Sequence, residues 1–329
     1  LLLALFLMGT QSTFFGPIKY AILPEVLKSD ELMSGNALFQ SGTSIAILVG
    51  MILGGSMIAL SDGNLMWVSG TVLCLASLGY LASRFILKQN IPAPDLNIDW
   101  NFFRTSLQTL RYAKNLPLIF TILLGNSWYG FYGATYLTQI PQLTQENLHG
   151  SENVVSLLLT LFSVGIGLGS LLCRKIGGSE VNIKMVPFGM LGLTVFAFYL
   201  AISLTFIPPM TGERLGIADL FSNGASYYHV MLSVSLLGIS GGFYIVPLYA
   251  MMQAYSPRSH RARVVAANNI LNAVFMVSSA VFSIIILSVL NIEIHILFCI
   301  TAVLSALFSI WLLKRLKQLM RQTQANLEN

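Results

Sequence analysis

The chain has 329 residues, of which 55% are hydrophobic and only 9% are charged. A soluble domain carries about a quarter charged residues, so this composition places most of the chain inside a lipid bilayer. The net charge of +5 does not indicate nucleic-acid binding, because the basic residues lie singly in short segments between apolar runs. The three cysteines lie far apart within such runs, which indicates neither a disulfide framework nor a metal site.

Apolar runs long enough to span a membrane occur nine times, and a spanning helix needs about 20 such residues. We therefore expect an all-α integral membrane fold with nine transmembrane helices. The runs cover about residues 1–18, 37–60, 65–87, 117–140, 153–173, 185–207, 229–252, 265–290 and 294–313. Weakly polar residues within them suit contacts between helices in lipid.

The basic residues predict the orientation of these helices. Of the 18 Lys and Arg residues, all but Arg214 fall on one side when the loops are assigned alternately to two sides. The positive-inside rule makes that side cytoplasmic. The sequence therefore predicts a cytoplasmic carboxyl terminus and, with nine spans, an amino end on the outside.

The longest cytoplasmic segment, 89–116, divides the chain into three helices (1–88) and six helices (117–313), followed by a basic tail (314–329). From Asp99 onward this linker has the amphipathic pattern of a helix at a membrane surface. Three more helices ahead of the chain would give six plus six about a central linker. That is the plan of a major facilitator superfamily transporter, so the visible helices would correspond to helices 4 to 12 of twelve.

Several stretches resemble the lysophospholipid transporter family of the major facilitator superfamily. Near the amino end these are FFGPIKYAILPE (14–25) and GNALFQSGTSIAILVGMILGG (35–55). GLGSLLCRKIGGSE (167–180), GGFYIVPLYAMMQ (241–253) and RARVVAANNILNA (261–273) are similar to the family's eighth, tenth and eleventh helices. The resemblance is greatest to the transporter half of proteins fused to an acyl-carrier-protein–phospholipid acyltransferase.

This resemblance implies a multi-pass protein of the bacterial inner membrane. It would flip lysophospholipid, chiefly lysophosphatidylethanolamine, to the inner leaflet, where a fused or separate acyltransferase restores the lost chain. The family's lysine falls on Lys19, Gln40 stands where a glutamate is common, and 117–141 contains no counterpart of a seventh-helix arginine. The resemblance implies that the substrate and membrane lipids are the binding partners, and it implies no cofactor. A transporter of a different small solute or drug on the same fold is the alternative.

Lys19 and the polar face of the following helix are the first candidate contacts. A lysine at a cavity mouth would attract the substrate phosphate, and a snorkelling lysine that fixes helix depth has the same pattern. Asn36, Gln40 and Thr43 recur at helical spacing on one face. Amides inside lipid are costly unless they meet partners or water, so this face either lines a cavity or hydrogen-bonds another helix.

A polar-aromatic stripe follows in 117–140. It consists of Tyr129, Tyr132, Tyr136 and Gln139. Such rings suit a site that holds a headgroup, with an ammonium over a tyrosine face, and equally suit ordinary aromatic packing.

Asn268 and Asn272 share a face at the start of 265–290, where they either line a cytoplasmic vestibule or tie the loop.

Arg174 and Glu180 resemble a degenerate copy of the superfamily's cytoplasmic loop motif, in which a charge pair locks one conformation. Their predicted role is gating, and plain topology signalling is the alternative.

The competing interpretation of the whole chain is that the protein is a membrane-embedded enzyme. None of the four histidines begins the H-x4-D motif of an acyltransferase, and no carboxylate pair lies within a span, so the sequence predicts a transporter.

Overall fold

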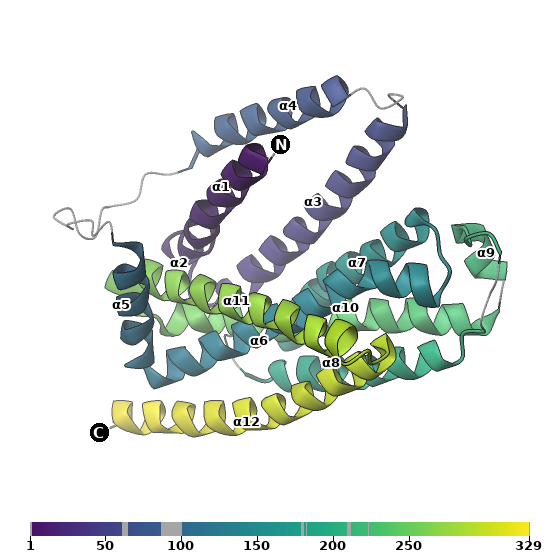
Figure 1. The fold of residues 1–329 in the computed structure, drawn as a ribbon. Helices are drawn as coiled ribbons and strands as arrows, with labels where there is room; N and C mark the ends of the chain where they lie inside the picture. Colours follow the sequence, from purple (N-terminus) through teal and green to yellow (C-terminus); the bar gives the residue numbers. More distant parts are fainter. Residues whose placement is uncertain are drawn as a thin grey trace.

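The computed structural model describes residues 2–60, 65–86, 101–178, 181, 183–208, 212–222 and 224–328, and these are predominantly helical (Figure 1). The long helices are α1 (Leu2–Ala21), α3 (Leu32–Leu60), α4 (Leu65–Ser83), α6 (Pro117–Gln142), α7 (Glu152–Gly177), α8 (Val186–Thr205), α10 (Ala225–Tyr255), α11 (Arg261–Ile284) and α12 (Ile294–Glu328). The short elements are α2 (Leu23–Val26), α5 (Phe102–Lys114), α9 (Ile217–Ser222), η1 (Leu143–Asn147), η2 (Arg258–His260) and η3 (Ile285–Val289).

A long helix overlaps each of the nine predicted spans, which confirms the all-helical membrane fold. Within the described ranges, seven helical segments are both long and apolar enough to cross a membrane. Helices α1 and α6 are not among them: only 2–12 of α1 is strongly apolar, and α6 carries buried polar residues such as Asn126, Ser127 and Gln139. The count of nine crossings therefore stays a prediction.

Consecutive long helices run in alternate directions, so their connections gather at two ends (Figure 1). One end, named the basic end here, holds the α2–α3 connection, α5, the α10–α11 connection and the end of α12. These segments carry basic residues including Lys28, Arg111, Arg258 and Arg321. At the other end, Leu215 N–H donates to His149 O at 2.8 Å and ties the start of α7 to the segment before α9. This arrangement agrees with the predicted sorting of basic residues, while the side of the membrane stays a prediction.

The two segments predicted outside the spans are helical where the structure describes them. The Asn101 side chain caps α5 by accepting a hydrogen bond from Arg104 N at 3.0 Å, and α5 packs against α6 and α11. The first part of the linker, 89–100, lies outside the described residues. The basic tail is helical as far as Glu328, as a continuation of α12, in which Leu316 is buried and Leu319 lies beside the start of α6.

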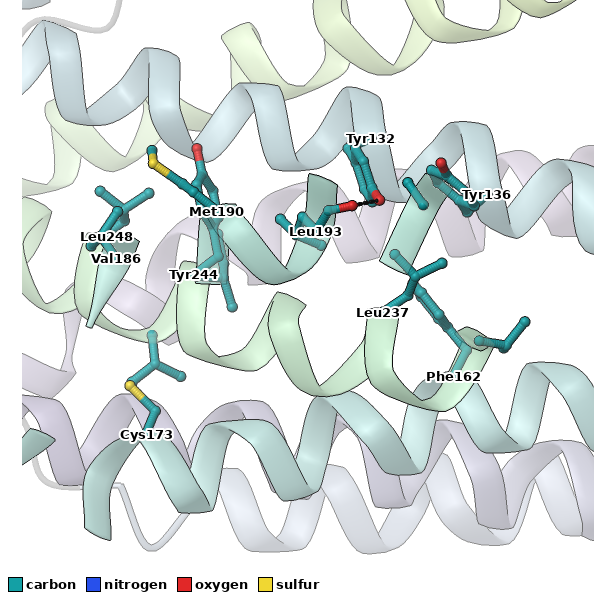
Figure 2. Close-up of a cluster of buried hydrophobic side chains, with 14 of the residues drawn as sticks. Tyr132, Tyr136, Phe162, Cys173, Val186, Met190, Leu193, Leu237, Tyr244 and Leu248 are labelled. Carbon is teal, nitrogen blue, oxygen red and sulfur yellow. Dashed lines mark hydrogen bonds between the residues drawn. The ribbon is translucent and has the colours of Figure 1, made fainter. Parts of the chain in front are cut away.

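Helix α10 lies at the centre of the six carboxyl-terminal helices and contacts α6, α7 and α8. The apolar core around it includes Phe162, Met190, Leu237 and Leu248 (Figure 2). Helices α7 and α10 approach so closely that a Cβ on Gly169 would lie 2.0 Å from Ile239 O. Small residues permit such backbone contact between membrane helices.

The pattern G-I-S-G-G at 238–242 belongs to this close contact. It has the spacing of a hydrolase nucleophile elbow, but it lies inside α10, where Ser240 Oγ donates to Leu236 O at 2.7 Å. A Cβ on Gly242 would lie 2.4 Å from Ser170 N of α7. An elbow requires a sharp turn between a strand and a helix that exposes the serine, and a buried serine in mid-helix does not provide it.

Helices α1, α3 and α4, which precede the linker, lie to one side of the carboxyl-terminal helices (Figure 1). Helix α1 contacts α11, and α3 contacts α7 and α10. Both α1 and α3 diverge from the carboxyl-terminal helices with distance from the basic end (Figure 1). The two groups of helices therefore meet closely near one end, and that junction contains most of the predicted polar residues.

Candidate functional site at the junction of the two helix groups

Lys19 lies half-buried at the end of α1. Its Nζ donates to Thr43 Oγ1 of α3 at 3.0 Å and lies 5.1 and 5.4 Å from the ring centroids of Tyr20 and Phe39. In the described part of the chain, no carboxylate lies within ion-pair distance of this ammonium. Cation–π contacts attract the ammonium but do not neutralise its charge. The arrangement leaves a partly desolvated positive charge that can attract an anion.

Asn36 and Gln253 form a reciprocal amide pair between α3 and α10. Asn36 Nδ2 donates to Gln253 Oε1 at 2.6 Å, and Gln253 Nε2 donates to Asn36 Oδ1 at 3.2 Å. Gln253 Nε2 also donates to Tyr20 O at 3.1 Å. The two side chains are only 2% and 0% exposed. Of the two interpretations of the Asn36 face, the structure favours hydrogen bonding between helices, while Gln40 is half-buried one turn further on.

Two more contacts join the same helices. The Tyr20 and Tyr249 rings stack with centroids 4.4 Å apart. Arg261 at the start of α11 donates to Glu25 Oε1 of α2 at 2.7 Å, and the arginine is buried. Below, the seam means these three contact pairs. They are Tyr20–Tyr249, Asn36–Gln253 and Glu25–Arg261.

A cluster of three amides, named the amide cluster, lies beside the seam between α6 and α11. Asn126 Nδ2 donates to Asn268 Oδ1 at 3.0 Å, and both residues are almost fully buried. Among the described residues, no group makes a hydrogen bond to Asn126 Oδ1, Asn268 Nδ2 or Asn272 Oδ1. The Tyr249 side chain lies near the amides of Asn268 and Asn272, which connects the cluster to the seam.

Tyr132 and Tyr136, two members of the tyrosine stripe of α6, do not face the other helix group. Tyr132 donates from its hydroxyl to Leu193 O of α8 at 2.7 Å (Figure 2), and Tyr136 stacks on Phe298 of α12 at 4.7 Å. Both rings are at most 1% exposed. Tyr129 lies against Gly241 of α10. In this arrangement α8, α10 and α12 enclose that face of α6, and contact of Tyr132 and Tyr136 with substrate stays a prediction.

Two predicted residues, Gln139 and Arg174, lie away from the seam. Gln139 is buried near the opposite end of α6 from the amide cluster, and its Nε2 donates to Thr138 Oγ1 at 3.5 Å. Arg174 is exposed at the end of α7. Glu180 lies outside the described residues, so the predicted gating pair stays a prediction.

Sequence reasoning missed several partners in the seam and the amide cluster. Gln253 is a single amide at the end of an apolar run, which is a signal that it has a buried partner. Asn126 lies in the tyrosine-rich run but faces α11 and not the tyrosine side. Glu25 and Arg261 are 236 residues apart, and no local pattern indicates that they pair.

Comparison with known proteins gives the family. The profile of the Major Facilitator Superfamily matches residues 1–142 and 129–326. Lysophospholipid transporter LplT from Klebsiella pneumoniae is 28% identical over 255 residues, which cover 75% of this chain and 56% of the relative. Proteins of the same name from Cronobacter sakazakii and Escherichia fergusonii are 27% and 25% identical, over 77% of this chain and 58% of each relative.

The chain thus spans less than three fifths of the length of these curated relatives. Matches to the superfamily profile nevertheless cover nearly all of its residues. The superfamily's two-group architecture also agrees with the helix groups that meet at the seam. The chain therefore belongs to the Major Facilitator Superfamily.

Proposed function

We propose that the protein moves lysophospholipid of the lysophosphatidylethanolamine type across the bacterial inner membrane by alternating access. One observation carries the proposal: Lys19, Asn36, Asn268 and Asn272, which the sequence singled out, come from three helices and lie at or beside one junction between the helix groups. Polar residues inside membrane segments are costly and mark substrate pathways. The name of the curated relatives supports the choice of substrate.

In this proposal Lys19 attracts the substrate phosphate. The ammonium is held by Thr43 and by two aromatic faces, and it is free of a carboxylate among the described residues. Attraction between charges is stronger in such a half-buried place than in water, because less solvent screens it. The phosphate would supply the counter-charge that the neighbouring residues of α1 and α3 do not.

The seam serves as the closed end of the transport pathway. Its contacts are an ion pair, two amide hydrogen bonds and one ring stack, all between side chains. Together these four contacts are worth about 2–12 kcal/mol, which a difference in substrate binding between the two states has to offset before the seam opens. With the basic end and the carboxyl terminus in the cytoplasm, opening delivers the lipid to the inner leaflet, where a fused or separate acyltransferase re-acylates it.

Uptake of labelled lysophosphatidylethanolamine by vesicles that contain the full-length protein tests the proposal. A charge-assisted hydrogen bond to phosphate is worth about 1.5–3 kcal/mol, so Lys19→Ala should lower uptake efficiency by about 10- to 100-fold. Lys28→Ala is the matched control, because Lys28 is an exposed lysine at the same end. It should leave uptake unchanged.

Three outcomes separate the possibilities. Uptake that persists in Lys19→Ala would contradict the phosphate role and reduce Lys19 to an anchor of helix depth. Equal losses in Lys19→Ala and Lys28→Ala would indicate a general effect of charge at the basic end. No uptake by correctly inserted wild-type protein would contradict lysophospholipid transport and favour a different small solute or drug.

A further inference from the structure

The amide cluster contains more hydrogen-bonding capacity than the protein uses. Asn126 is 1% exposed and Asn268 is 0% exposed, yet in the described part of the chain each retains one buried polar atom without a partner, and Asn272 Oδ1 is a third. Buried polar groups in native proteins are nearly always paired, so an unpaired set indicates a water or a ligand that completes it.

The unpaired set has a definite chemistry. When two amides share one hydrogen bond, the oxygen of the donating amide and the nitrogen of the accepting amide are left over. The pair therefore always leaves one acceptor and one donor, even if the O and N positions of either amide are exchanged. An ammonium only donates and a phosphate only accepts, whereas a hydroxyl does both. The described contacts of these three side chains are to amides, a tyrosine and a methionine sulfur, and none is to a charged group. A neutral hydroxyl therefore fits the cluster better than an ion, which would lose its hydration without gaining a counter-charge.

The position of the cluster connects it with the junction between the helix groups. Asn272 is half-buried, and its Oδ1 would lie 3.4 Å from a Cβ on Gly130 of α6. Neighbouring Asn269 approaches α1, where its Nδ2 would lie 3.4 Å from a Cβ on Gly16. Separation of α1 from α11 would therefore open the cluster toward the space between the groups. Tyr20, which stacks on Tyr249, directly follows Lys19 in the sequence.

We infer that the amide cluster binds the free glycerol hydroxyl of the lysophospholipid, with Asn126, Asn268 and Asn272 as specificity-determining residues. This rests on the proposed function, in which Lys19 attracts the phosphate of the same molecule. A diacyl phospholipid carries an ester at that position, which accepts but does not donate a hydrogen bond. A site built to hydrogen-bond a hydroxyl discriminates strongly against a substrate that lacks it, because its own polar groups are then left unpaired.

The test compares lysophosphatidylethanolamine with its 2-deoxy analogue, in which hydrogen replaces the glycerol hydroxyl and the headgroup is unchanged. Uptake into vesicles and thermal stabilisation of the detergent-solubilised full-length protein are both measured. We expect the wild-type protein to prefer the hydroxyl-bearing lipid at least tenfold. In Asn126→Leu/Asn268→Leu the ratio between the two lipids should fall to near one, in thermal stabilisation as well as in uptake.

Two further variants separate loss of the hydroxyl site from a general loss of folding. Asn272→Leu alters a half-buried position and should lower the ratio partially. Thr121→Val removes a buried hydroxyl that bonds only within α6, to Pro117 O at 2.8 Å, and should keep the full ratio. The wild-type comparison of the two lipids needs no variant at all.

The outcomes distinguish this inference from the proposed function. Robust uptake of both lipids at equal efficiency would overturn the hydroxyl site and leave lysophospholipid transport standing, with water as the occupant of the cluster. Stabilisation by the hydroxyl-bearing lipid alone, without uptake, would support the site and contradict transport. Neither uptake nor stabilisation by either lipid would overturn both.

Discussion

The interface between α7 and α10 and the seam hold their helices together by different means. At the first, glycines bring backbone against backbone: Cβ atoms on Gly165 and Gly238 would lie 2.5 Å and 2.3 Å from carbonyl oxygens of the opposite helix. At the seam, long side chains from α1, α2 and α3 reach to α10 and α11 and meet in pairs. One interface is continuous and the other consists of separate contacts.

This difference indicates which interface can open. Backbone packing along α7 and α10 gains many small dispersion contacts at once, and separating the helices loses all of them. A side-chain pair in the seam can be exchanged for water, lipid headgroups or substrate, one contact at a time. Transport by alternating access, as proposed above, needs rigid groups and a junction whose contacts can be exchanged.

The largest expected effect comes from filling the glycine interface. Gly169→Ala places a methyl group against Ile239 O of α10, and overpacking of this kind costs about 1–3 kcal/mol or more. The free energy of unfolding in mixed detergent micelles measures it. Gly133→Ala is the matched control, because a Cβ there meets nothing within 4 Å. If both variants unfold alike, the distinction between the two interfaces is wrong.

Next in size is the amide pair of the seam. Asn36→Leu removes one partner and leaves the buried Gln253 amide short of a hydrogen bond, which costs the closed state about 1–3 kcal/mol. A cysteine introduced at Ser256, in a background without the native cysteines, reports opening through its alkylation rate. We expect that rate to rise by about 5- to 150-fold.

The double variant Asn36→Leu/Gln253→Leu sharpens the measurement. Replacing both partners with apolar residues leaves fewer unpaired groups, so its effect should be smaller than the sum of the two single effects. Strict additivity would mean that the two amides act independently of each other.

A smaller effect is expected for the ion pair. The Glu25 side chain is 45% exposed and solvent screens it, so Glu25→Ala should cost the closed seam only about 1 kcal/mol, even though it leaves Arg261 buried without its partner. The same alkylation assay should show a rise of about fivefold. The exchanged pair Glu25→Arg/Arg261→Glu should restore slow alkylation, and Asp30→Ala, at an exposed acid nearby, should leave it unchanged.

The smallest effects concern the two core tyrosines. Tyr132→Phe loses the hydrogen bond to Leu193 O and should lower the free energy of unfolding by about 1 kcal/mol. Among the described residues no group makes a hydrogen bond to the Tyr136 hydroxyl, so Tyr136→Phe should be neutral or slightly stabilising. Both should transport lysophospholipid normally. A transport defect in either variant without a loss of stability would reinstate the tyrosine stripe as a substrate contact.

Much of the fold could be predicted from local patterns. The apolar runs predicted where helices form, because the length of such a run depends on bilayer thickness and not on distant residues. The alternation of basic loops predicted which connections share an end. Boundaries were less accurate: α12 continues beyond the predicted end of its span because Leu312 and Leu316 keep an apolar face packed on the bundle.

The site was predicted only in part, for a physical reason. Helical periodicity places Asn36 and Gln40 on one face, but it does not say which helix that face meets. The partner of Asn36 proved to be Gln253, 217 residues away, and the partner of Asn268 proved to be Asn126. The same periodicity grouped Tyr132 with Tyr129, yet packing against α8 placed that ring in the core.

The sequence alone determined that this is a helical membrane protein of the Major Facilitator Superfamily type, with its basic residues sorted to one side and a lysine beside a polar helix face. Composition and periodicity carry that information because the bilayer acts on each segment separately. Only the tertiary structure decided which polar groups are paired, which are left open, and which interface can part. Those properties depend on contacts between segments far apart in the chain, which no local pattern records.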